Sequence, residues 1–280
     1  MSFSPSKFSQ IKFHFKYVPE KLRNYLNLYT LHERENWKML DIGSGPGHIL
    51  SEVLPVLPTN YEEILCIDNE ADMVNYLNSV NTNPRISSRQ LDIETKNLPN
   101  DLKEHFDFAF SSNCLMYIGN YRQAFSNVNQ ILKPNGELFF IWCKMCPVKE
   151  IYCELSQTEK WNTYFKDFRN WKSHFNTEHS MNLLENICQF AELDILKVEE
   201  LNNLFIEYDG IQSFINIFDS LDFMSGTVPK RDFLEYKRDY HKLMMSYITT
   251  ESATKEQTKV KLHFPSMVLA AKKTNGTSRR

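Results

Sequence analysis

The stretch that most constrains the fold is Met39-Leu40-Asp41-Ile42-Gly43-Ser44-Gly45-Pro46-Gly47. A short apolar run that opens into three alternating glycines predicts a buried strand and a tight turn, and residues 48–54 then take up helical periodicity. Glycine suits such a turn because it adopts positive φ and lets a ligand approach the main chain. The pattern indicates a strand–loop–helix nucleotide site, while the ligand has to be decided by residues further along the chain.

Acidic residues at two later positions test this interpretation. Asp68 follows the apolar run 63–67, about where a Rossmann-type unit places the carboxylate that accepts the ribose hydroxyls. Asp92 and Ile93 follow a third strand that we predict over 85–91. Asp68 or Asp92 alone is equally well explained as an ordinary turn residue. Together with Asp41, at this spacing, they favour a cofactor site.

Strands and helices alternate over residues 39–111, which predicts parallel strand pairing with right-handed crossovers and therefore an α/β fold. After the first two strands and the helix between them we expect a helix at 71–77, a strand at 106–111, a helix at 121–132, a turn at 133–136 and a strand at 137–142. The side chains that follow the strands should face the ligand, because open α/β sheets bind ligands beyond the carboxyl ends of their strands.

The alternating glycines after Asp41, the two later acids, and a helix followed by Lys133-Pro134-Asn135-Gly136 and an apolar strand resemble the class I S-adenosylmethionine-dependent methyltransferases. The resemblance implies a Rossmann-like seven-stranded sheet with helical lid insertions, and S-adenosyl-L-methionine as cofactor. The residues that it implies for cofactor binding are Asp41, Gly43, Ser44, Gly45, Gly47, Asp68, Asn69, Asp92, Ile93 and Ser111. In that family a pair such as Asp92 and Ile93 holds the adenine amino group and packs on its ring. The predicted catalytic residues are Tyr117, in the loop after the fourth strand, and Trp142, at the end of the fifth.

A narrower resemblance rests on residues 151–161, which contain Leu155-Ser156-Gln157-Thr158-Glu159-Lys160-Trp161, and on the fourth-strand region 110–125. Both are similar to the arthropod juvenile hormone acid O-methyltransferases. The resemblance implies methyl transfer to the carboxylate of a lipophilic acid, such as farnesoic or juvenile hormone acid, to give a methyl ester. Two positions differ from the family, which commonly has Trp at Tyr117 and a substrate-contacting Gln near Val18. A related enzyme acting on another lipophilic acid is therefore an alternative.

The same residues bear on other possible functions. Methyltransferases of adenine or amide nitrogen usually carry Asp/Asn-Pro-Pro-Tyr after the fourth strand, where this chain has Ser112-Asn113-Cys114-Leu115. An amine or phenol acceptor would need a general base, whereas a carboxylic acid is already an anion at neutral pH. A dinucleotide fingerprint would have its third glycine at His48. A methyltransferase for an amine or phenol, or a non-catalytic cofactor-binding protein, remain alternatives.

Composition limits the partners. The formal net charge of −3 does not suggest a nucleic-acid binder, and no apolar run approaches the ~18 residues of a membrane span. The six cysteines form no disulfide framework, which predicts reduced thiols and a cytoplasmic protein. Cys143-Lys144-Met145-Cys146 has metal-like spacing, but no second pair completes four ligands, so we predict no metal. The sequence leaves the oligomeric state open.

We divide the chain into an N-terminal helical lid (1–34), a methyltransferase domain (35–271) with helical insertions at about 147–180 and 209–250, and a basic tail (272–280). A helix at 17–26 would lie across the cofactor site or cover the sheet. The aromatic-rich insertions would form a lid over a lipophilic substrate or only pack into their own cores. Strands are expected at 194–208 and at 260–271, the latter interrupted at Pro265. The first nineteen residues lack acids and Arg, and a targeting role for them is left open.

Overall fold

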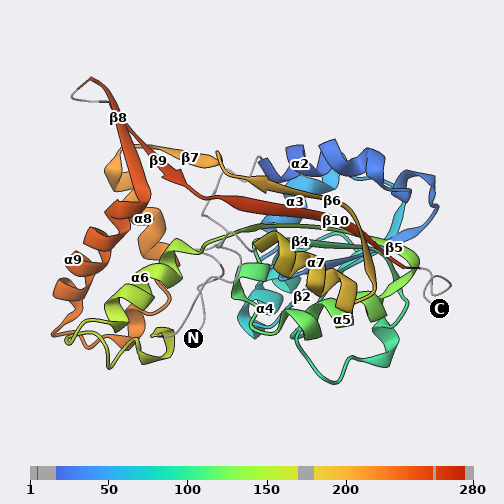
Figure 1. Ribbon diagram of the computed structural model, residues 1–280, viewed down its shortest axis with the longest axis horizontal. Helices are drawn as coiled ribbons and strands as arrows, with labels where there is room; N and C mark the ends of the chain where they lie inside the picture. Colours follow the sequence, from blue (N-terminus) through green and yellow to red (C-terminus); the bar gives the residue numbers. More distant parts are fainter. Residues whose placement is uncertain (1–4, 6–16, 170–179, 255–256, 275–280) are drawn as a thin grey trace. The chain divides into compact units, whose positions relative to one another are not determined.

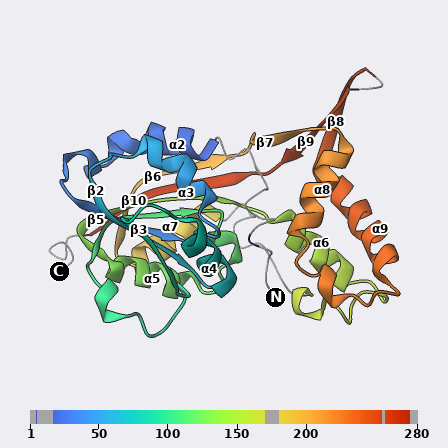
Figure 2. The same cartoon turned by 180° about the vertical axis from the view of Figure 1, so that it is seen from behind.

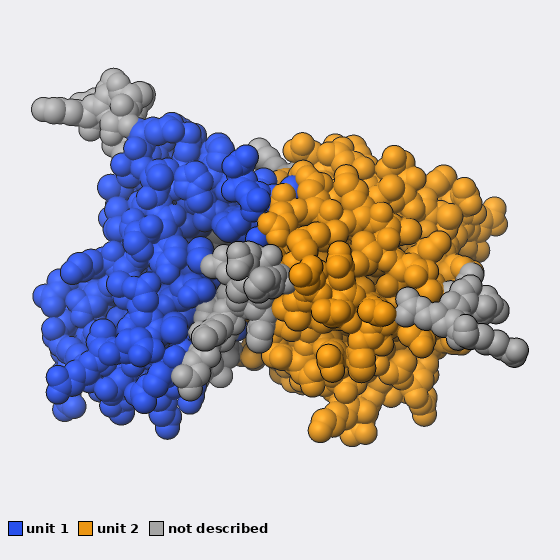
Figure 3. All heavy atoms as spheres, in the orientation of Figure 1, with its two compact units in different colours: residues 1–13, 143–177, 201–266 blue, residues 14–142, 178–200, 267–280 orange. Residues whose placement is uncertain are grey.

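The computed structural model describes residue 5 and residues 17–169, 180–254 and 257–274, and it contains two sheets (Figure 1). Contacts within the chain divide it into two compact units, which are coloured separately in Figure 3. We call the described residues of 14–142, 178–200 and 267–280 the sheet unit. We call the described residues of 1–13, 143–177 and 201–266 the insertion unit.

A seven-stranded sheet organises the sheet unit. Its strands are β1 (Trp37–Ile42), β2 (Tyr61–Asp68), β3 (Ile86–Gln90), β4 (Phe106–Ser112), β5 (Leu132–Cys143), β6 (Leu193–Leu201) and β10 (Ser266–Lys273). They lie in the order β3-β2-β1-β4-β5-β10-β6, and β1 pairs in parallel with both β2 and β4. The pairs β2/β3 and β4/β5 are also parallel. This arrangement confirms the predicted α/β fold with a Rossmann-like seven-stranded sheet.

Helices cover both faces of this sheet (Figures 1 and 2). They are α2 (Tyr17–Tyr25), α3 (His48–Val53), α4 (Ala71–Val80), α5 (Tyr121–Ile131) and α7 (Ser180–Phe190). Neighbouring side chains of a strand point to opposite faces, so Phe139 and Phe140 of β5 mark the two sides. Tyr25 of α2 packs edge-on against Phe139 at 5.5 Å, and Phe125 of α5 packs edge-on against Phe140 at 5.8 Å. Helices α2 and α5 therefore cover opposite faces.

Of the two positions expected for the N-terminal helix, the contacts of α2 correspond to the one that covers the sheet. The Tyr25 hydroxyl donates to Glu199 Oε2 of β6 at 2.7 Å, and Val18 is fully buried. Only the start of the helix approaches the carboxyl ends of the strands, where Asn113 Nδ2 donates to the Tyr17 hydroxyl at 3.5 Å. Because Val18 is packed into the protein, it is a core residue; the family that the chain resembles commonly has a substrate-contacting Gln near this position.

The turn expected at 133–136 lies inside β5 and interrupts its register with β4. Phe106 pairs with Leu132 and Phe108 with Glu137, so four residues of β5 stand opposite the single residue Asp107. Asp107 lies near the amino end of β4. Its carboxylate accepts from Lys133 Nζ at 2.7 Å and from Arg34 Nη1 at 3.1 Å. This charge cluster holds the extra residues in place, which periodicity alone did not reveal.

A second sheet corrects two strand predictions. The single strand expected at 194–208 is two strands, β6 and β7 (Phe205–Asp209), and they belong to different sheets. The break at Pro265 is confirmed, because β9 (Gln257–His263) ends before it and β10 begins after it. Strand β9 pairs antiparallel with β7 and with β8 (Ile248–Thr254). The helical prediction for 209–250 was thus wrong at its end, because pairing with β9 makes residues 248–250 part of a strand.

Aromatic side chains form the core of the insertion unit, which contains the helices α6 (Pro147–Ser156), α8 (Ile211–Leu221) and α9 (Phe233–Met244). The ring of Tyr152 stacks on Phe165 at 5.2 Å and meets Phe223 edge-on at 5.0 Å. Phe165 in turn stacks on Tyr236 of α9 at 5.7 Å. These aromatic residues pack on one another, which corresponds to the expectation that the insertions form their own core.

A buried carboxylate lies within this aromatic core. Asp222 has a side chain that is 0% exposed, and its Oδ1 accepts from the hydroxyls of Tyr152 at 2.9 Å and Tyr236 at 2.7 Å. Lys237 Nζ donates to Asp222 Oδ2 at 2.8 Å and to Asp219 Oδ1 at 2.9 Å. A buried charge is costly unless it is paired and hydrogen-bonded, and here three donors satisfy it.

We predict that Asp222→Ala lowers the free energy of unfolding by about 3–5 kcal/mol, because Lys237 and two tyrosine hydroxyls lose their acceptor in a dry core. Urea denaturation followed by circular dichroism measures this loss. Asp209→Ala is the matched control, since Asp209 also pairs with a lysine but its side chain is 88% exposed. An equal effect of both variants would contradict a structural role of the buried carboxylate.

Candidate functional site

The candidate site lies at the carboxyl ends of β1, β2 and β4. The parallel register places Ile42 opposite Ile67 on one side and Ser111 on the other, so the residues that follow all three strands meet at one edge. In the sheet, β2 and β3 lie on one side of β1, and β4 and β5 lie on the other, so the strand order reverses at β1. Open α/β sheets bind ligands at such a topological switch point. We call this region the carboxyl edge.

The glycine turn after β1 is fixed by the protein's own packing. Gly43, Gly45 and Gly47 have φ values of 69°, 54° and 83°, which favour glycine. A Cβ atom at Gly43 would lie 2.3 Å from Cys114 Sγ, and one at Gly47 would lie 2.5 Å from Leu77 Cδ1. The expected reason for these glycines was the close approach of a ligand. At Gly43 and Gly47 neighbouring side chains already exclude a Cβ.

Asp68 ends β2 and holds the glycine turn. Its Oδ2 accepts from the Gly45 amide at 2.8 Å, and its Oδ1 accepts from the Glu70 amide at 3.0 Å. Burial raises the pKa of Asp68, while these backbone hydrogen bonds act in the opposite direction. Each carboxylate oxygen keeps a further lone pair, so the residue fits hydroxyl donors such as those of a ribose. Next to it, the carbonyl of Asn69 accepts from Gln90 Nε2 at 3.0 Å.

Asp41 lies inside β1, two residues before Gly43, and is only 2% exposed. Burial, and secondly the nearby charge of Asp68, raise the pKa of Asp41 to about 8. A carboxyl group with that pKa is protonated in most molecules at neutral pH. The carboxyl edge therefore carries less negative charge at pH 7 than its sequence suggests.

The loop after β3 presents Asp92 to solvent and buries Ile93. The Asp92 Oδ1 atom accepts from the Glu94 amide at 2.8 Å, which shapes the turn. The Ile93 carbonyl accepts from Asn127 Nδ2 of α5 at 2.7 Å. An exposed carboxylate beside a buried apolar side chain fits the amino group and the ring of an adenine, the roles that the resemblance implied.

Two of the predicted cofactor-binding residues are serines that form hydrogen bonds with backbone groups of the protein. Ser111 is 1% exposed, and its hydroxyl donates to the Ile42 carbonyl at 2.9 Å, so it ties β4 to β1. Ser44 is buried in the turn, where its amide donates to the Ile67 carbonyl at 3.1 Å and its carbonyl accepts from the Gly47 amide at 3.0 Å. Both residues position the loop, and direct cofactor contacts by their side chains stay predictions.

The two predicted catalytic residues have opposite environments. Tyr117 is 42% exposed and ends a 3-10 turn, η5 (Leu115–Tyr117), that follows β4. Trp142 lies near the end of β5 and is fully buried. Tyr117 is accessible to a ligand, whereas the indole of Trp142 lies within the protein. A catalytic contact by either residue stays a prediction.

Residues that the sequence analysis did not assign also lie at the carboxyl edge. Asn113 has a φ of 54°, and its Nδ2 donates to Ser112 Oγ at 3.2 Å as well as to Tyr17. Asn tolerates this backbone conformation better than most residues, which is a signal that the sequence did contain. Burial, followed by the charges of Asp68 and Asp41, raises the pKa of the Cys114 thiol to about 12. Cys114 is thus a packing residue and not a thiolate nucleophile.

The histidine next to the glycine turn, His48, is a weak base. Burial lowers the pKa of His48, at the start of α3, to about 4, so its imidazole is neutral at pH 7 and takes up protons poorly. His105 precedes β4, where its Nε2 lies 2.9 Å from Glu63 Oε2, so it lies before the amino end of the strand as expected. His14, His174 and His179, which the sequence could not place, lie outside the described residues.

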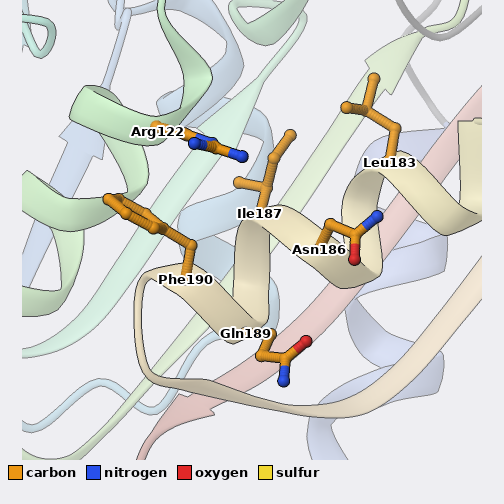
Figure 4. Close-up of a pocket in the computed structure, with 6 residues that line it drawn as sticks. All are labelled: Arg122, Leu183, Asn186, Ile187, Gln189 and Phe190. Carbon is orange, nitrogen blue, oxygen red and sulfur yellow. The ribbon is translucent and has the colours of Figure 1, made fainter.

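A separate pocket of about 470 Å³ lies between α5 and α7, in the sheet unit (Figure 4). It is lined by Arg122, Leu183, Asn186, Ile187, Gln189 and Phe190. The Arg122 guanidinium lies 5.1 Å from the centre of the Phe190 ring. None of the predicted cofactor-binding residues lines this pocket.

Two further expectations concern metals and membranes. Within the residues that the structure describes, no three His, Cys, Asp or Glu side chains are grouped to hold a metal ion. Burial raises the pKa of Cys143, in the pair with metal-like spacing, to about 12. No helix among the described residues is long and apolar enough to cross a membrane.

Comparison with known proteins places residues 40–138 in the family described as "Methyltransferase domain". Over 182 residues the chain is 29% identical to the juvenile hormone acid O-methyltransferase of Drosophila melanogaster, which covers 62% of this chain and 60% of that protein. The enzyme of the same name from Bombyx mori is 28% identical over 175 residues, 62% of each chain. The similarity thus spans less than two thirds of these relatives.

Solved structures show the same fold at low identity. A methyltransferase-like protein from Bacillus halodurans superposes with a TM-score of 0.55 at 14% identity, over 91% of this chain and 100% of that one. The YcgJ protein of Bacillus subtilis superposes with a TM-score of 0.54 at 17% identity, again over 91% of this chain and 100% of that one. The cyclase SpnF superposes with a TM-score of 0.53 at 16% identity, over 91% of this chain and 81% of that one. A cyclase on this fold shows that the fold alone does not determine the reaction.

We predict that Gly43→Ala weakens binding of S-adenosylhomocysteine at least roughly tenfold and lowers stability by about 1–2 kcal/mol. The new Cβ would meet Cys114 Sγ, and alanine disfavours a φ of 69°. Isothermal calorimetry and thermal unfolding measure the two effects. Gly226→Ala is the matched control, because no atom lies within 4 Å of its added Cβ. Unchanged affinity in Gly43→Ala would remove this turn from the cofactor site.

We predict that Asp41→Asn changes the pH dependence of stability in the ligand-free protein. The Asp41 pKa is about 8 in the folded chain against 3.8 ordinarily, so between these values the folded chain binds more protons than the unfolded one. Stability from this group is therefore lost as pH rises towards 8, whereas the amide of the variant does not titrate and has no such loss. The unfolding free energy of the variant relative to the native protein should rise from about pH 5 to about pH 8 in urea denaturation. A difference independent of pH would contradict the raised pKa.

Proposed function

We propose that the chain, whose residues 40–138 match a methyltransferase-domain family, is an S-adenosylmethionine-dependent carboxyl O-methyltransferase. Its acceptor is the carboxylate of a lipophilic acid, such as farnesoic or juvenile hormone acid, and its product is the methyl ester. The observation that carries the proposal is the similarity to two juvenile hormone acid O-methyltransferases.

The side chains at the carboxyl edge are chemically suited to this cofactor. S-adenosyl-L-methionine supplies an activated methyl group on a positively charged sulfur. Asp68 accepts from the ribose hydroxyls, and Asp92 and Ile93 receive the adenine. Gly43, Gly45 and Gly47 let the turn follow β1 closely, while bonds of Ser44, Asn69 and Ser111 hold the ends of the four strands β1 to β4 together.

A carboxylate acceptor suits the weak bases at this edge. The new bond forms between a carboxylate oxygen and the methyl carbon, the electron pair of the old bond stays on sulfur, and no proton has to move. Neutral His48, whose pKa is about 4, would be a poor base for a phenol or an amine. Protonated Asp41 lessens repulsion of an anionic acceptor.

The chain then contributes mainly alignment and exclusion of water. Holding two reactants in line can contribute about 7–11 kcal/mol to lowering a barrier. Tyr117, exposed on the turn after β4, donates a hydrogen bond to an acceptor oxygen or packs against its chain. Trp142, buried at the end of β5, supports the site from inside the protein.

The test is release of S-adenosylhomocysteine with farnesoic acid, lauric acid, farnesol or no acceptor. We expect turnover of farnesoic acid to exceed that of lauric acid at least roughly tenfold, because the branched chain fits a shaped apolar site. Farnesol has nearly the same chain without a carboxylate and should not react. Turnover of farnesol would contradict carboxyl transfer. Binding of S-adenosylhomocysteine without any turnover would favour an amine or phenol acceptor or a non-catalytic role.

A further inference from the structure

Glu94 joins two loops of the carboxyl edge. It follows Asp92 and Ile93 in the loop after β3, and its Oε1 accepts from the backbone amides of Gly119, at 3.1 Å, and Asn120. Asn120 lies 26 residues further along the chain, at the end of the loop that follows β4 and contains Tyr117. One carboxylate therefore connects the predicted adenine side of the site with the loop that the proposed function assigns to the acceptor.

The amide of Asn120 takes its acceptor from a distant loop, because the side chain that would accept it locally is turned toward another partner. Asn120 is the N-cap of α5, and its side chain accepts from the Gln123 amide at 3.1 Å. In a capping box the Gln123 side chain would accept from the N-cap amide in return. Here Gln123 Nε2 donates instead to Asn127 Oδ1 at 3.1 Å. Glu94 takes that place, and a carboxylate is favoured there by the helix dipole as well.

A second contact fixes the same loop to the same helix. Asn127 is 1% exposed, and its Nδ2 donates to the carbonyls of Ile93 and Thr95, both at 2.7 Å. The loop at 92–95 is thus held by α5 on both sides of Glu94. The side chain of Asn127 is buried, with one of its two bonds buried and the other part-buried, whereas Glu94 is half-buried and both of its bonds to the amides are exposed. This leaves the Glu94 contacts as the ones that ligand binding at Asp92 can strengthen.

We propose that Glu94 is a positioning residue that couples cofactor binding at Asp92 and Ile93 to the order of residues 113–120, which carry Tyr117. This role rests on the proposed function for its effect on turnover, but the coupling itself does not. Cofactor that orders the 92–95 loop fixes the Glu94 carboxylate, which then holds the amides of Gly119 and Asn120. Coupling between sites is reciprocal, so an acceptor held by the 113–120 loop strengthens cofactor binding as well.

The test is amide hydrogen exchange in the full chain with and without S-adenosylhomocysteine, for the native protein, Glu94→Ala and Glu94→Gln. We expect the ligand to slow exchange at Gly119 and Asn120 in the native protein, and this slowing to be lost in Glu94→Ala. Glu94→Gln retains an amide oxygen that accepts hydrogen bonds and should restore part of it. Affinity for S-adenosylhomocysteine should fall about threefold to tenfold in Glu94→Ala. The variant loses one or two charge-assisted hydrogen bonds, and water replaces them only in part.

The matched control is Glu137→Gln. Glu137 also accepts from a backbone amide, that of Thr30 at 2.8 Å, but on β5 at its pairing with Phe108 near the amino end of β4. We expect the control to leave exchange at Gly119 and Asn120 and the ligand affinity unchanged. Ligand-induced slowing that persists in Glu94→Ala overturns the proposal, as does loss of slowing with unchanged affinity. If the native protein binds S-adenosylhomocysteine without methylating any acid, the proposed function fails while the exchange result still decides the coupling.

Discussion

The carboxyl edge depends on one carboxylate, that of Asp68, which bonds the backbone on two sides. By accepting from the amides of Gly45 and Glu70, it fixes the turn after β1 to the end of β2. The turn then adopts positive φ values that only glycine takes up easily, and its surface is pressed against Cys114 and Leu77. The glycine turn therefore takes its shape from parallel strand pairing and from packing within the protein.

Burial determines the electrostatics of this edge more than the count of acids does. Three aspartates lie at or near the carboxyl ends of neighbouring strands, yet the pKa of Asp41 lies near 8 because water is excluded around it. The same exclusion lowers the pKa of His48 and raises that of Cys114. Asp41, His48 and Cys114 are therefore mostly uncharged at pH 7 beside the Asp68 carboxyl group.

The insertion unit has a buried carboxylate within an aromatic core. Its aromatic rings give it a core of its own, and within that core Asp222 is stabilised by two tyrosine hydroxyls and Lys237. An isolated charge in such a core would be strongly unfavourable, so these four side chains depend on one another. The sequence showed the aromatic residues at helical spacing, but Asp222, Tyr152 and Lys237 are far apart in the chain and gave no signal that they meet.

The sequence alone determined the α/β fold and the strands whose carboxyl ends carry Asp41, Asp68 and Ser111, because these depend on local hydrophobic period and on glycines with a required conformation. Tertiary structure decided where strands 194–208 and 260–271 divide between two sheets, since strand pairing depends on distant partners. It also decided that Cys114 explains Gly43, that Trp142 is buried, and that Glu94 caps a helix 26 residues away. Each of these follows from contacts between segments remote in sequence, and a pattern within a single segment carries no information about them.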